Sequence, residues 1–362
     1  MATERELTIG MMCETRNVSR LKTACAAFSK ANDASFFYFV PEDVNLEDKT
    51  IHGQTLSMGE WVTRTFEYPD VIHDCVARRG KFHDEVYEGL ASIPMTTDKP
   101  FKVGDKMQVY RKIESDGRFA DLLIPSVQVT NMEQIRLWLD RYQGIILKPV
   151  RGMQGKRVFC VKQTQTGFTV IKDRETIHLT ESKLEKWLQT EGMADNIRYL
   201  IQPLICSETQ DGNPFDIRAH MARGKNGDWQ IVRIYPRVGP RTSITSNFST
   251  GGYLADLDHF CELDLGMPNI RDFKRKLSKL ALTFAPHMEK LLKYGLHQLA
   301  MDMGLDANGK LWLFEVNFNR IGVNFQEVEI ARHAIDYAIH LARTHAVQQT
   351  KRMDQSRQLI FA

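Results

Sequence analysis

The sequence predicts an α/β protein built from two or three domains. A chain of 362 residues is too long for one small hydrophobic core and favours division into domains. Residues 7–12, 18–31 and 35–40 have the patterns of a strand, a helix and a second strand, an order typical of a βαβ unit with a parallel sheet. Near the other end, the Asn308-Gly309 step predicts a β-hairpin, because a type I′ turn needs two residues that accept positive φ.

Composition and charge exclude several classes of protein. Hydrophobic residues make up 43% of the chain and charged residues 26%, as in ordinary globular domains. The formal net charge of +3 is too small to favour nucleic acid or an anionic membrane as the main partner. No apolar run approaches the ~20 residues that span a bilayer. The first ten residues lack the apolar core of a signal peptide, so we expect a cytoplasmic protein.

The cysteines indicate reduced thiols rather than disulfides or a zinc site. They are scattered and form no CxxC pair, which is typical of a cytosolic protein. The six are Cys13, Cys25, Cys75, Cys160, Cys206 and Cys261.

Residues 1–98 are expected to form the first domain, a small α/β unit. Beyond the βαβ unit, residues 50–56 and 71–75 have further strand patterns. No GxGxxG motif follows the first strand, so the dinucleotide-binding fingerprint is absent. The domain is interpreted either as a scaffold or as one wall of a substrate cleft.

A lysine and a glycine-containing loop in the next segment indicate contacts with phosphate. Lys148 follows three aliphatic residues in a predicted strand, where an amine is costly to bury without an anion. The loop after it contains Gly152 and Gly155, whose backbone N–H groups can face a phosphate, and it ends at Lys156-Arg157. The spacing is not that of a Walker A loop. The competing interpretation of Lys148 is a strand-end lysine in a salt bridge.

The remaining patterns alternate between helices and strands. Helices are predicted at residues 105–114, 132–142, 182–191, 270–294 and 328–349, and strands at 158–162, 199–205, 215–223 and 229–237. Pro203 lacks an N–H group, so its strand is expected to be an edge strand or a link between two lobes. Pro286 is expected to kink or split the long helix around it.

Polar side chains share one face of the strand 215–223. Alternation places Asp216, Arg218 and His220 on this face. An exposed ion pair between Asp216 and Arg218 is the competing interpretation, and His220 and His297 are interpreted as histidines that satisfy local hydrogen bonds. The polar loop 237–252 is either disordered, with no role, or ordered by an anion.

The hairpin of residues 299–319 predicts a metal site. With a two-residue turn, Asp302 lies opposite Glu315 and Ala300 opposite Asn317, all on one face. The other face pairs Met301 with Val316, Met303 with Phe314 and Leu305 with Trp312. Carboxylates directly opposite each other repel unless a cation lies between them, and such hard oxygen donors suit Mg²⁺. The competing interpretation is a solvated, charged face.

Four motifs follow one another in the chain, and their order resembles that of the ATP-grasp superfamily across about residues 100–345. They are ILKPVRGMQGK, IQPLI, DIR with a later arginine and SNFSTGG, and MDMGLDANGKLWLFEVN. The DIR-to-EVN series is similar to the branch that holds ribosomal-protein glutamate ligases and bacterial glutathione synthetases. The whole chain resembles the YheC/YheD family, which is described as endospore coat-associated.

The resemblance implies an α+β ATP-grasp fold with a small α/β pre-ATP-grasp domain in front of it. The implied division is a first domain at 1–98, a small lobe at 99–198 with the lysine and glycine loop, a C-terminal lobe at 199–349 with the metal site, and a tail at 350–362. ATP would lie between the two lobes.

The resemblance also implies roles for individual residues. Those that match nucleotide-binding positions are Lys106, Lys148, Gly152, Gln154, Gly155, Lys156, Gln202, Pro203, Leu204 and Asp216. Those that match positions near the reacting groups are Arg218, Arg237 and Asn247, with Arg241 nearby, and the metal ligands are Asp302, Glu315 and Asn317. Two positions depart from the pattern: Arg157 stands where many relatives have glycine, and EVNFNR lacks the proline that often follows.

The implied function is an ATP-dependent carboxylate–amine ligase that acts through an acyl phosphate, with one or two Mg²⁺ ions, or Mn²⁺ in their place. Spore-coat or cell-envelope modification is the implied setting. The alternatives are a kinase that phosphorylates a hydroxyl group and a non-catalytic ATP-binding protein of spore-coat assembly. The expected partners are small-molecule or peptide carboxylates and amines, a second copy of the chain and spore-coat proteins, with no nucleic acid and no membrane.

Overall fold

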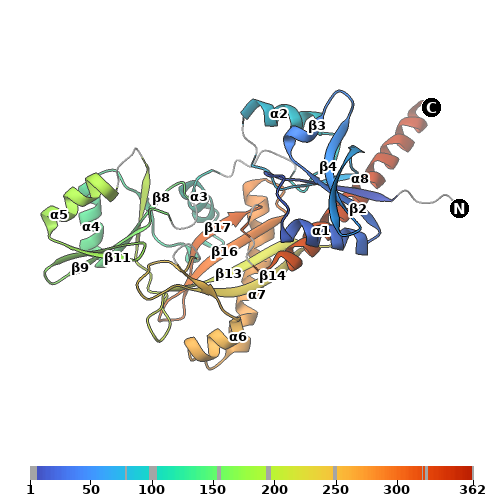
Figure 1. The fold of residues 1–362 in the computed structure, drawn as a ribbon. Helices are drawn as coiled ribbons and strands as arrows, with labels where there is room; N and C mark the ends of the chain where they lie inside the picture. Colours follow the sequence, from blue (N-terminus) through green and yellow to red (C-terminus); the bar gives the residue numbers. More distant parts are fainter. Residues whose placement is uncertain are drawn as a thin grey trace.

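The structure, a computed structural model, describes residues 6–77, 80–97, 104–152, 156–192, 197–247, 251–319, 321–322 and 325–360. These residues form three sheets, which follow one another along the chain. In Figure 1 the first sheet lies on the right in blue, the second on the left in green, and the third between them in yellow and orange. This arrangement confirms the predicted mixed α and β fold.

The first sheet contains the predicted βαβ unit. Its strand order is β3-β4-β2-β1-β6, with β5 paired to β4. The elements are β1 (Leu7–Met12), α1 (Arg20–Ala31), β2 (Ala34–Phe39), a 3-10 turn (Pro41–Asp43), β3 (Val44–Asn45), β4 (Thr50–Ser57), β5 (Glu60–Glu67), β6 (Val71–Asp74) and α2 (Gly80–Gly89). Strand β1 lies parallel to both β2 and β6, and α1 connects β1 to β2. Ser19 caps α1 by accepting a hydrogen bond from the Lys22 N–H.

The C-terminal helix α8 (Glu327–Ile360) packs in the core of this first domain. Its buried residues Ala331 and Ile335 belong to the same hydrophobic cluster as Ile9 of β1 and Cys25 of α1. Residues 350–360, predicted as a tail, continue this helix. The helix therefore joins the end of the chain to its first domain.

The second sheet has the strand order β11-β10-β9-β8-β12-β7. The elements of this region are α3 (Lys106–Asp116), a 3-10 turn (Ala120–Leu122), β7 (Val127–Gln128), α4 (Met132–Tyr142), β8 (Gly144–Pro149), β9 (Phe159–Thr164), β10 (Gly167–Lys172), β11 (Glu175–Leu179), α5 (Glu181–Trp187), a π turn (Leu188–Gly192) and β12 (Tyr199–Pro203). Helix α4 has the predicted limits. Strand β12 is not an edge strand, because it lies between β8 and the short β7. Pro203 is its last residue, where a missing N–H interrupts the ladder least.

The third sheet is antiparallel, with the strand order β15-β14-β13-β16-β17. Its elements are β13 (Phe215–Arg223), β14 (Trp229–Val238), β15 (Tyr253–Leu254), α6 (Leu257–His259), a π turn (Phe260–Asp264), α7 (Ile270–Leu292), β16 (Gln298–Leu305) and β17 (Leu311–Phe318). Helix α7 covers one face, where Phe284 and Met288 pack in one core with Met301 and Met303. The opposite face is left for polar side chains.

Helix α7 continues through Pro286, so the helix is not split there as the sequence suggested. Proline removes the N–H that would bond to the carbonyl of Leu282, four residues earlier. Leu282 is 40% exposed, so water can reach this part of the helix and hydrate the carbonyl.

The hairpin of β16 and β17 has the predicted register near the charged residues and a different one near the turn. Asp302 lies opposite Glu315, Ala300 opposite Asn317 and Met301 opposite Val316, as predicted. Beyond Asp302 the register shifts by one, so Met303 faces Leu313, Gly304 faces Trp312 and Leu305 faces Leu311. Phe314 is left as the extra residue of a β-bulge.

The predicted two-residue turn is wrong. The Gly309 N–H bonds to the carbonyl of Asp306, and the Asp306 N–H bonds to the carbonyl of Lys310. Gly309 has a φ of 74° and Asn308 is not among the residues with positive φ, so the turn is longer than a type I′ turn. The one-residue error at the turn and the bulge at Phe314 cancel, and the charged residues end in the predicted register.

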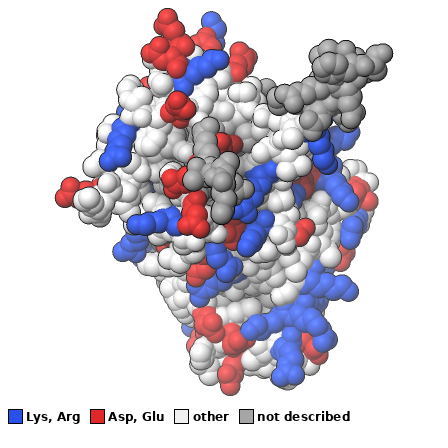
Figure 2. Space-filling view, turned by 90° about the vertical axis from the view of Figure 1, so that its right-hand side faces the viewer, with Lys and Arg blue, Asp and Glu red and all other residues white. Residues whose placement is uncertain are grey.

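Charged side chains of both signs lie on the surface of the molecule. None of the helices in the described ranges is both long and apolar enough to cross a bilayer. Figure 2 shows that acidic and basic side chains both occur across one face of the molecule, with basic ones denser at its lower right. This mixture agrees with the small net charge.

Candidate active site

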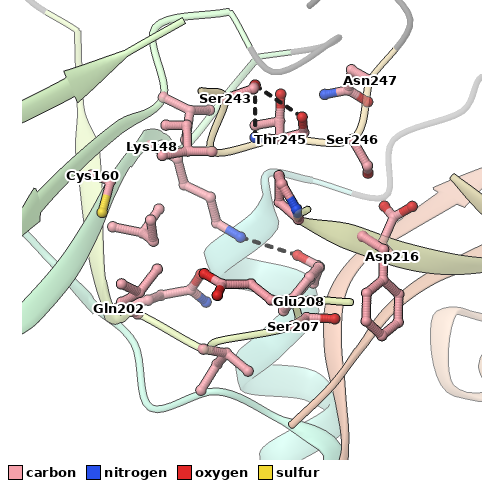
Figure 3. A pocket seen from close by; sticks show the side chains of 18 of the residues that line it. Lys148, Cys160, Gln202, Ser207, Glu208, Asp216, Ser243, Thr245, Ser246 and Asn247 are labelled. Atoms are coloured by element: carbon pink, nitrogen blue, oxygen red, sulfur yellow. Dashed lines mark hydrogen bonds between the residues drawn. The ribbon is translucent and has the colours of Figure 1, made fainter. Parts of the chain in front are cut away.

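A pocket lies between the second and third sheets (Figure 3). Strands β8, β9 and β12 contribute to it from one side, and β13, β14, β16 and β17 from the other. Ten predicted site residues line it: Lys106, Lys148, Gln202, Pro203, Leu204, Asp216, Arg237, Asn247, Asp302 and Glu315. Residues as far apart in the chain as Lys106 and Glu315, 209 positions, therefore meet in one place.

The other predicted site residues fall outside the lining of this pocket. Arg218 and Asn317 contact Asp302 from the same sheet face. Gly152 and Lys156 flank the glycine loop, and Gln154 and Gly155 lie outside the described residues.

Lys148 extends from β8 across the pocket (Figure 3). Its Nζ donates hydrogen bonds to the carbonyl of Phe314 at 3.0 Å and to the Tyr110 hydroxyl at 3.3 Å. Burial, together with the positive charge of Lys106, lowers the pKa of Lys148 to about 7, and Glu315 opposes the change. Both hydrogen-bond partners are uncharged oxygens, so the structure does not show the salt-bridged lysine of the competing interpretation. An anion in the pocket would restore the positive charge.

The β-bulge in β17 is part of this arrangement. Phe314 is the bulged residue, and its carbonyl accepts hydrogen bonds from both Lys148 and Tyr110. A bulge redirects the backbone of one strand, and such irregularities are common beside active sites. The Tyr110 hydroxyl donates at 2.7 Å, so the carbonyl keeps a partner when Lys148 moves toward a ligand.

Lys106 connects the glycine loop to the hairpin. It is the first residue of α3, which Asp105 caps by accepting from the Gln108 N–H. Lys106 Nζ donates to the carbonyl of Gly152 at 3.1 Å and lies 3.2 Å from Glu315 Oε1. Two lysines thus approach the same side of the pocket, one from α3 and one from β8.

Two buried arginines enclose Asp302. Arg218 of β13 donates to both of its oxygens, through Nε and Nη2, at 2.7 Å each. Arg237 of β14 lies 3.0 Å from Oδ2 and also pairs with Asp216, through Nε at 2.7 Å and through Nη2. Burial alone would raise the pKa of Asp302, but the charges and hydrogen bonds of Arg218 and Arg237 hold it well below its usual range.

These pairs replace the surface pair that the sequence allowed. Asp216 and Arg218 do not pair with each other, because each faces a partner on a neighbouring strand: Asp216 faces Arg237, and Arg218 faces Asp302. Asp216, Arg237 and Asp302 are 4–6% exposed. The charged residues are therefore the buried floor of the pocket rather than a solvated face.

The hairpin brings together oxygen donors of the kind that bind a divalent cation. Asp302 lies directly opposite Glu315, and Asn317 Nδ2 lies 3.2 Å from Asp302 Oδ2. Within the described residues there is no cluster of three or more His, Cys, Asp or Glu side chains suited to a metal. Asp302 and Glu315 supply two carboxylates, so a third ligand from the hairpin has to be the Asn317 amide oxygen. Carboxylate and amide oxygens together suit Mg²⁺.

The opposite end of the pocket is more apolar. Its lining there includes Ile146, Val158 and Ile171, beside the link between the lobes. In that link the Leu204 N–H bonds to the carbonyl of Gly144. Gln202 is 3% exposed, and its Nε2 donates to Ser126 Oγ at 2.7 Å. An apolar cleft beside backbone groups suits a planar heterocycle such as adenine.

The polar loop after β14 forms another wall of the pocket (Figure 3). Ser243 Oγ donates to the carbonyl of Thr245 at 2.9 Å and accepts from the Thr245 N–H at 3.1 Å. The Gly252 N–H bonds to the carbonyl of Asn247. The described part of this loop, residues 239–247, is thus held by its own hydrogen bonds, and Asn247 faces the site.

Arg157, at the end of the glycine loop, has a φ of 59°. Residues with a side chain rarely adopt this left-handed conformation, which glycine adopts without strain. The backbone conformation therefore explains why glycine suits this position. The sequence alone showed that Arg157 replaces this glycine, but it did not show the positive φ.

Tyr110 and Glu208 are among the residues of the site that the sequence analysis missed. Tyr110 lies four residues after Lys106 on the predicted helix, so their shared helix face was a usable signal. Glu208, an exposed carboxylate in the pocket wall, follows the link between the lobes and has no pattern of its own.

The fold and the site together define an ATP-grasp protein. The model of the YheC/D-like ATP-grasp family matches residues 94–343, and the chain belongs to this family. The endospore coat-associated protein YheD of Bacillus subtilis (strain 168) is 24% identical over 328 residues, which cover 84% of this chain and 70% of that protein.

Solved structures share the fold at low sequence identity. The ATP-grasp ligase PsnB, complexed with its minimal precursor, is 13% identical with a TM-score of 0.53 over 92% of this chain and 99% of that one. D-alanyl-alanine synthetase A of Vibrio cholerae is 12% identical with a TM-score of 0.52 over 95% of this chain and 99% of that one. At this identity the likeness shows the fold alone.

Proposed function

We propose that this protein is an ATP- and Mg²⁺-dependent ligase that joins a carboxylate to an amine through an acyl phosphate. One observation carries the proposal: Lys148, Lys106 and Arg237 meet the carboxylates of the hairpin in one pocket between two sheets. Membership of the YheC/D-like ATP-grasp family supports ATP as the co-substrate.

The proposed reaction has two steps. An oxygen of the substrate carboxylate attacks the γ-phosphorus of ATP, the bond to the β-phosphate oxygen breaks, and ADP leaves. The nitrogen of the amine then attacks the acyl carbon, the bond to the phosphate oxygen breaks, and phosphate leaves as the nitrogen loses a proton. Neither step requires a Ser, Cys or His nucleophile.

The chain supplies positive charge and orientation. A transferring phosphoryl group gathers charge on its oxygens, so fixed cations stabilise the transition state. Lys148 of β8 and Lys106 of α3 would face the phosphates from one side of the pocket, and Arg237 of the third sheet would face them from the other. Asp302, Glu315 and Asn317 would hold Mg²⁺, which shields the phosphate charge when it is bound. The two lobes enclose the site and limit attack of water on the acyl phosphate.

The test is incubation with Mg-ATP and pools of carboxylates and amines, followed by mass analysis of the products. ADP together with an amide supports the ligase. ADP with a phosphoester would instead identify a kinase, and absence of ATP binding by calorimetry in the presence of Mg²⁺ would refute both.

Glu315→Ala should separate activity from stability. We expect activity to fall by more than the roughly 10–100-fold that loss of an outer-shell metal partner costs. The Glu315 side chain is 32% exposed and its ion pair with Lys106 is screened, so the free energy of unfolding should change by less than about 1 kcal/mol. Steady-state kinetics and urea unfolding measure the two effects. Unfolding of the variant without metal present would show that Glu315 is structural.

Nucleotide binding should take up a proton at pH 8. Lys148 has a pKa of about 7 without nucleotide, and a triphosphate beside it would raise that value. About 0.9 proton should therefore bind with the nucleotide at pH 8, and affinity should fall up to about tenfold per pH unit above 7. Calorimetry with Mg-AMP-PNP in two buffers of different ionisation enthalpy measures the uptake. The same uptake in Lys148→Met would rule out this lysine as its source.

A setting in spore-coat or cell-envelope modification extends the proposal. It is supported by the name of the relative YheD, which is described as endospore coat-associated. Deletion of the gene in its host, followed by mass analysis of coat and envelope fractions for a lost amide-linked product, tests it.

A further inference from the structure

A buried group of polar side chains continues the charged sheet face beyond Arg218. His220 follows Arg218 by two residues on β13, so the two side chains point to the same side about 7 Å apart along the strand. His220 lies opposite Ala300 of β16, next to the Asp302 position. Helix α8 contacts β13, and Gln326, which directly precedes it, and His333 within it lie at this end of the sheet.

Three nitrogen atoms in this group have no hydrogen-bond partner among the described residues. They are Nε2 of His220, Nε2 of Gln326 and Nδ1 of His333. The three side chains are 1%, 1% and 2% exposed. Buried polar atoms nearly always have a partner, and an unpaired donor costs stability, so three in one group require an explanation.

The three side chains are close to one another. Burial, together with the charge of Arg218, lowers the pKa of His220 to about 3, and the nearby side chains of Gln298 and Gln326 oppose this. His333 also lies near enough to His220 to influence its pKa. The unpaired atoms thus belong to one cluster that begins at the arginine of the candidate active site.

The neighbouring polar network is fully paired by contrast. His297 Nδ1 lies 3.2 Å from Thr97 Oγ1, and Asn319 Oδ1 accepts from the N–H groups of His297 and Gln298. The sequence analysis expected both His220 and His297 to satisfy local hydrogen bonds. The described contacts show this for His297, whereas His220 keeps one unpaired nitrogen.

We propose that His220, Gln326 and His333 form a substrate subsite that binds an uncharged hydrogen-bonding group, such as the amide of a peptide-like substrate. The position rests on the proposed function, because the group lies beyond Arg218 and Asp302 on the side away from the nucleotide end of the pocket. There it would hold the part of a substrate that projects past the reacting carboxylate or amine.

The chemistry of the cluster favours an uncharged ligand. Both imidazoles are neutral at pH 7, since burial lowers the pKa of His333 to about 4 as well. Neutral donors and acceptors match a carbonyl or an amide N–H, and Gln326 Nε2 can only donate. Phe325, next to Gln326, has a φ of 59° and a side chain 69% exposed, so a movement that opens the Gln326 amide to a ligand would also release strain.

The experiment compares two near-isosteric variants, Gln326→Met and His333→Phe, with the wild type. We expect each to keep or raise the midpoint of thermal unfolding, because an unpaired buried polar group is removed. We expect the KM for one substrate to rise about tenfold while the KM for ATP stays unchanged. Ser29→Ala is the matched control, because Ser29 Oγ is another unpaired buried atom, in α1 and not on the sheet face that carries Arg218 and His220.

Two results would overturn the proposal. Variants with a raised midpoint and unchanged KM values, like the control, would show that the atoms are unpaired or hydrated for structural reasons only. A rise in the KM for ATP, or unfolding of both variants, would assign the cluster to the architecture.

A binding measurement distinguishes this proposal from the proposed function. The probe is N-acetyl-L-alanine amide at millimolar concentration with Mg-AMP-PNP, and the readout is the thermal midpoint of the wild type and of Gln326→Met. A saturable shift that is lost in the variant supports the subsite even where no substrate pool gives a product. Absence of any shift in the wild type overturns it.

Discussion

Asp302→Ala is expected to lower the free energy of unfolding by about 3–5 kcal/mol and to abolish activity. The side chain is 4% exposed and accepts hydrogen bonds from Arg218, Arg237 and Asn317. Its removal leaves Arg218 without a counter-charge inside the protein, and a buried unpaired charge is among the most costly defects. Urea unfolding and nucleotide-dependent kinetics measure the two effects.

A second substitution separates the loss of stability from the loss of activity. In Asp302→Ala combined with Arg218→Met, the stranded guanidinium is replaced by an apolar side chain, so most of the lost stability should return. Activity should not return, because the oxygen donor and the arginine are both missing. Unchanged stability in the single variant would show that the arginines do not rely on Asp302.

The hairpin shows what a local pattern can and cannot predict. The alternation of polar and apolar residues correctly placed Asp302 opposite Glu315. The turn type was wrong, because the Asp306 carboxylate accepts hydrogen bonds from the N–H groups of Asn308 and Lys310 and from the Trp312 indole and so holds a longer turn. The bulge at Phe314 was not visible, because the Phe314 carbonyl meets Lys148 and Tyr110 from another lobe. Register near the charged residues was recovered because the one-residue error at the turn and the bulge at Phe314 cancel.

The choice of partners for the charged residues needed the fold. Sequence alternation put Asp216 and Arg218 on one face, but it could not tell that each pairs across a different neighbouring strand. Strand order is a property of the whole sheet, so the pairs Asp216–Arg237 and Arg218–Asp302 follow only from the topology. For the same reason, the packing of α8 against the first domain had no local signal.

Lys148→Met is expected to lower kcat/KM about 10²–10³-fold, the cost of removing one preorganised donor of positive charge at a transition state. Stability at pH 7 should be kept or raised. The carbonyl of Phe314 keeps the Tyr110 hydroxyl at 2.7 Å, so it is not left unpaired, and a buried amine is removed. Lys112→Met, an exposed lysine on the same helix as Lys106, is the control.

The free energy of unfolding of Lys148→Met should also lack one pH dependence that the wild type has. Folding lowers the pKa of Lys148 from 10.5 to about 7, so the unfolded chain binds more protons than the folded one between these values. This group therefore makes the nucleotide-free wild type more stable as pH rises from 7 toward 10.5, and the contribution is lost as pH falls through 7. Lys148→Met should lack this rise when urea unfolding is repeated from pH 6 to pH 10. A variant that retained both the rise and wild-type turnover would show that Lys148 neither holds the charge nor contacts the phosphates, because the same buried amine accounts for both.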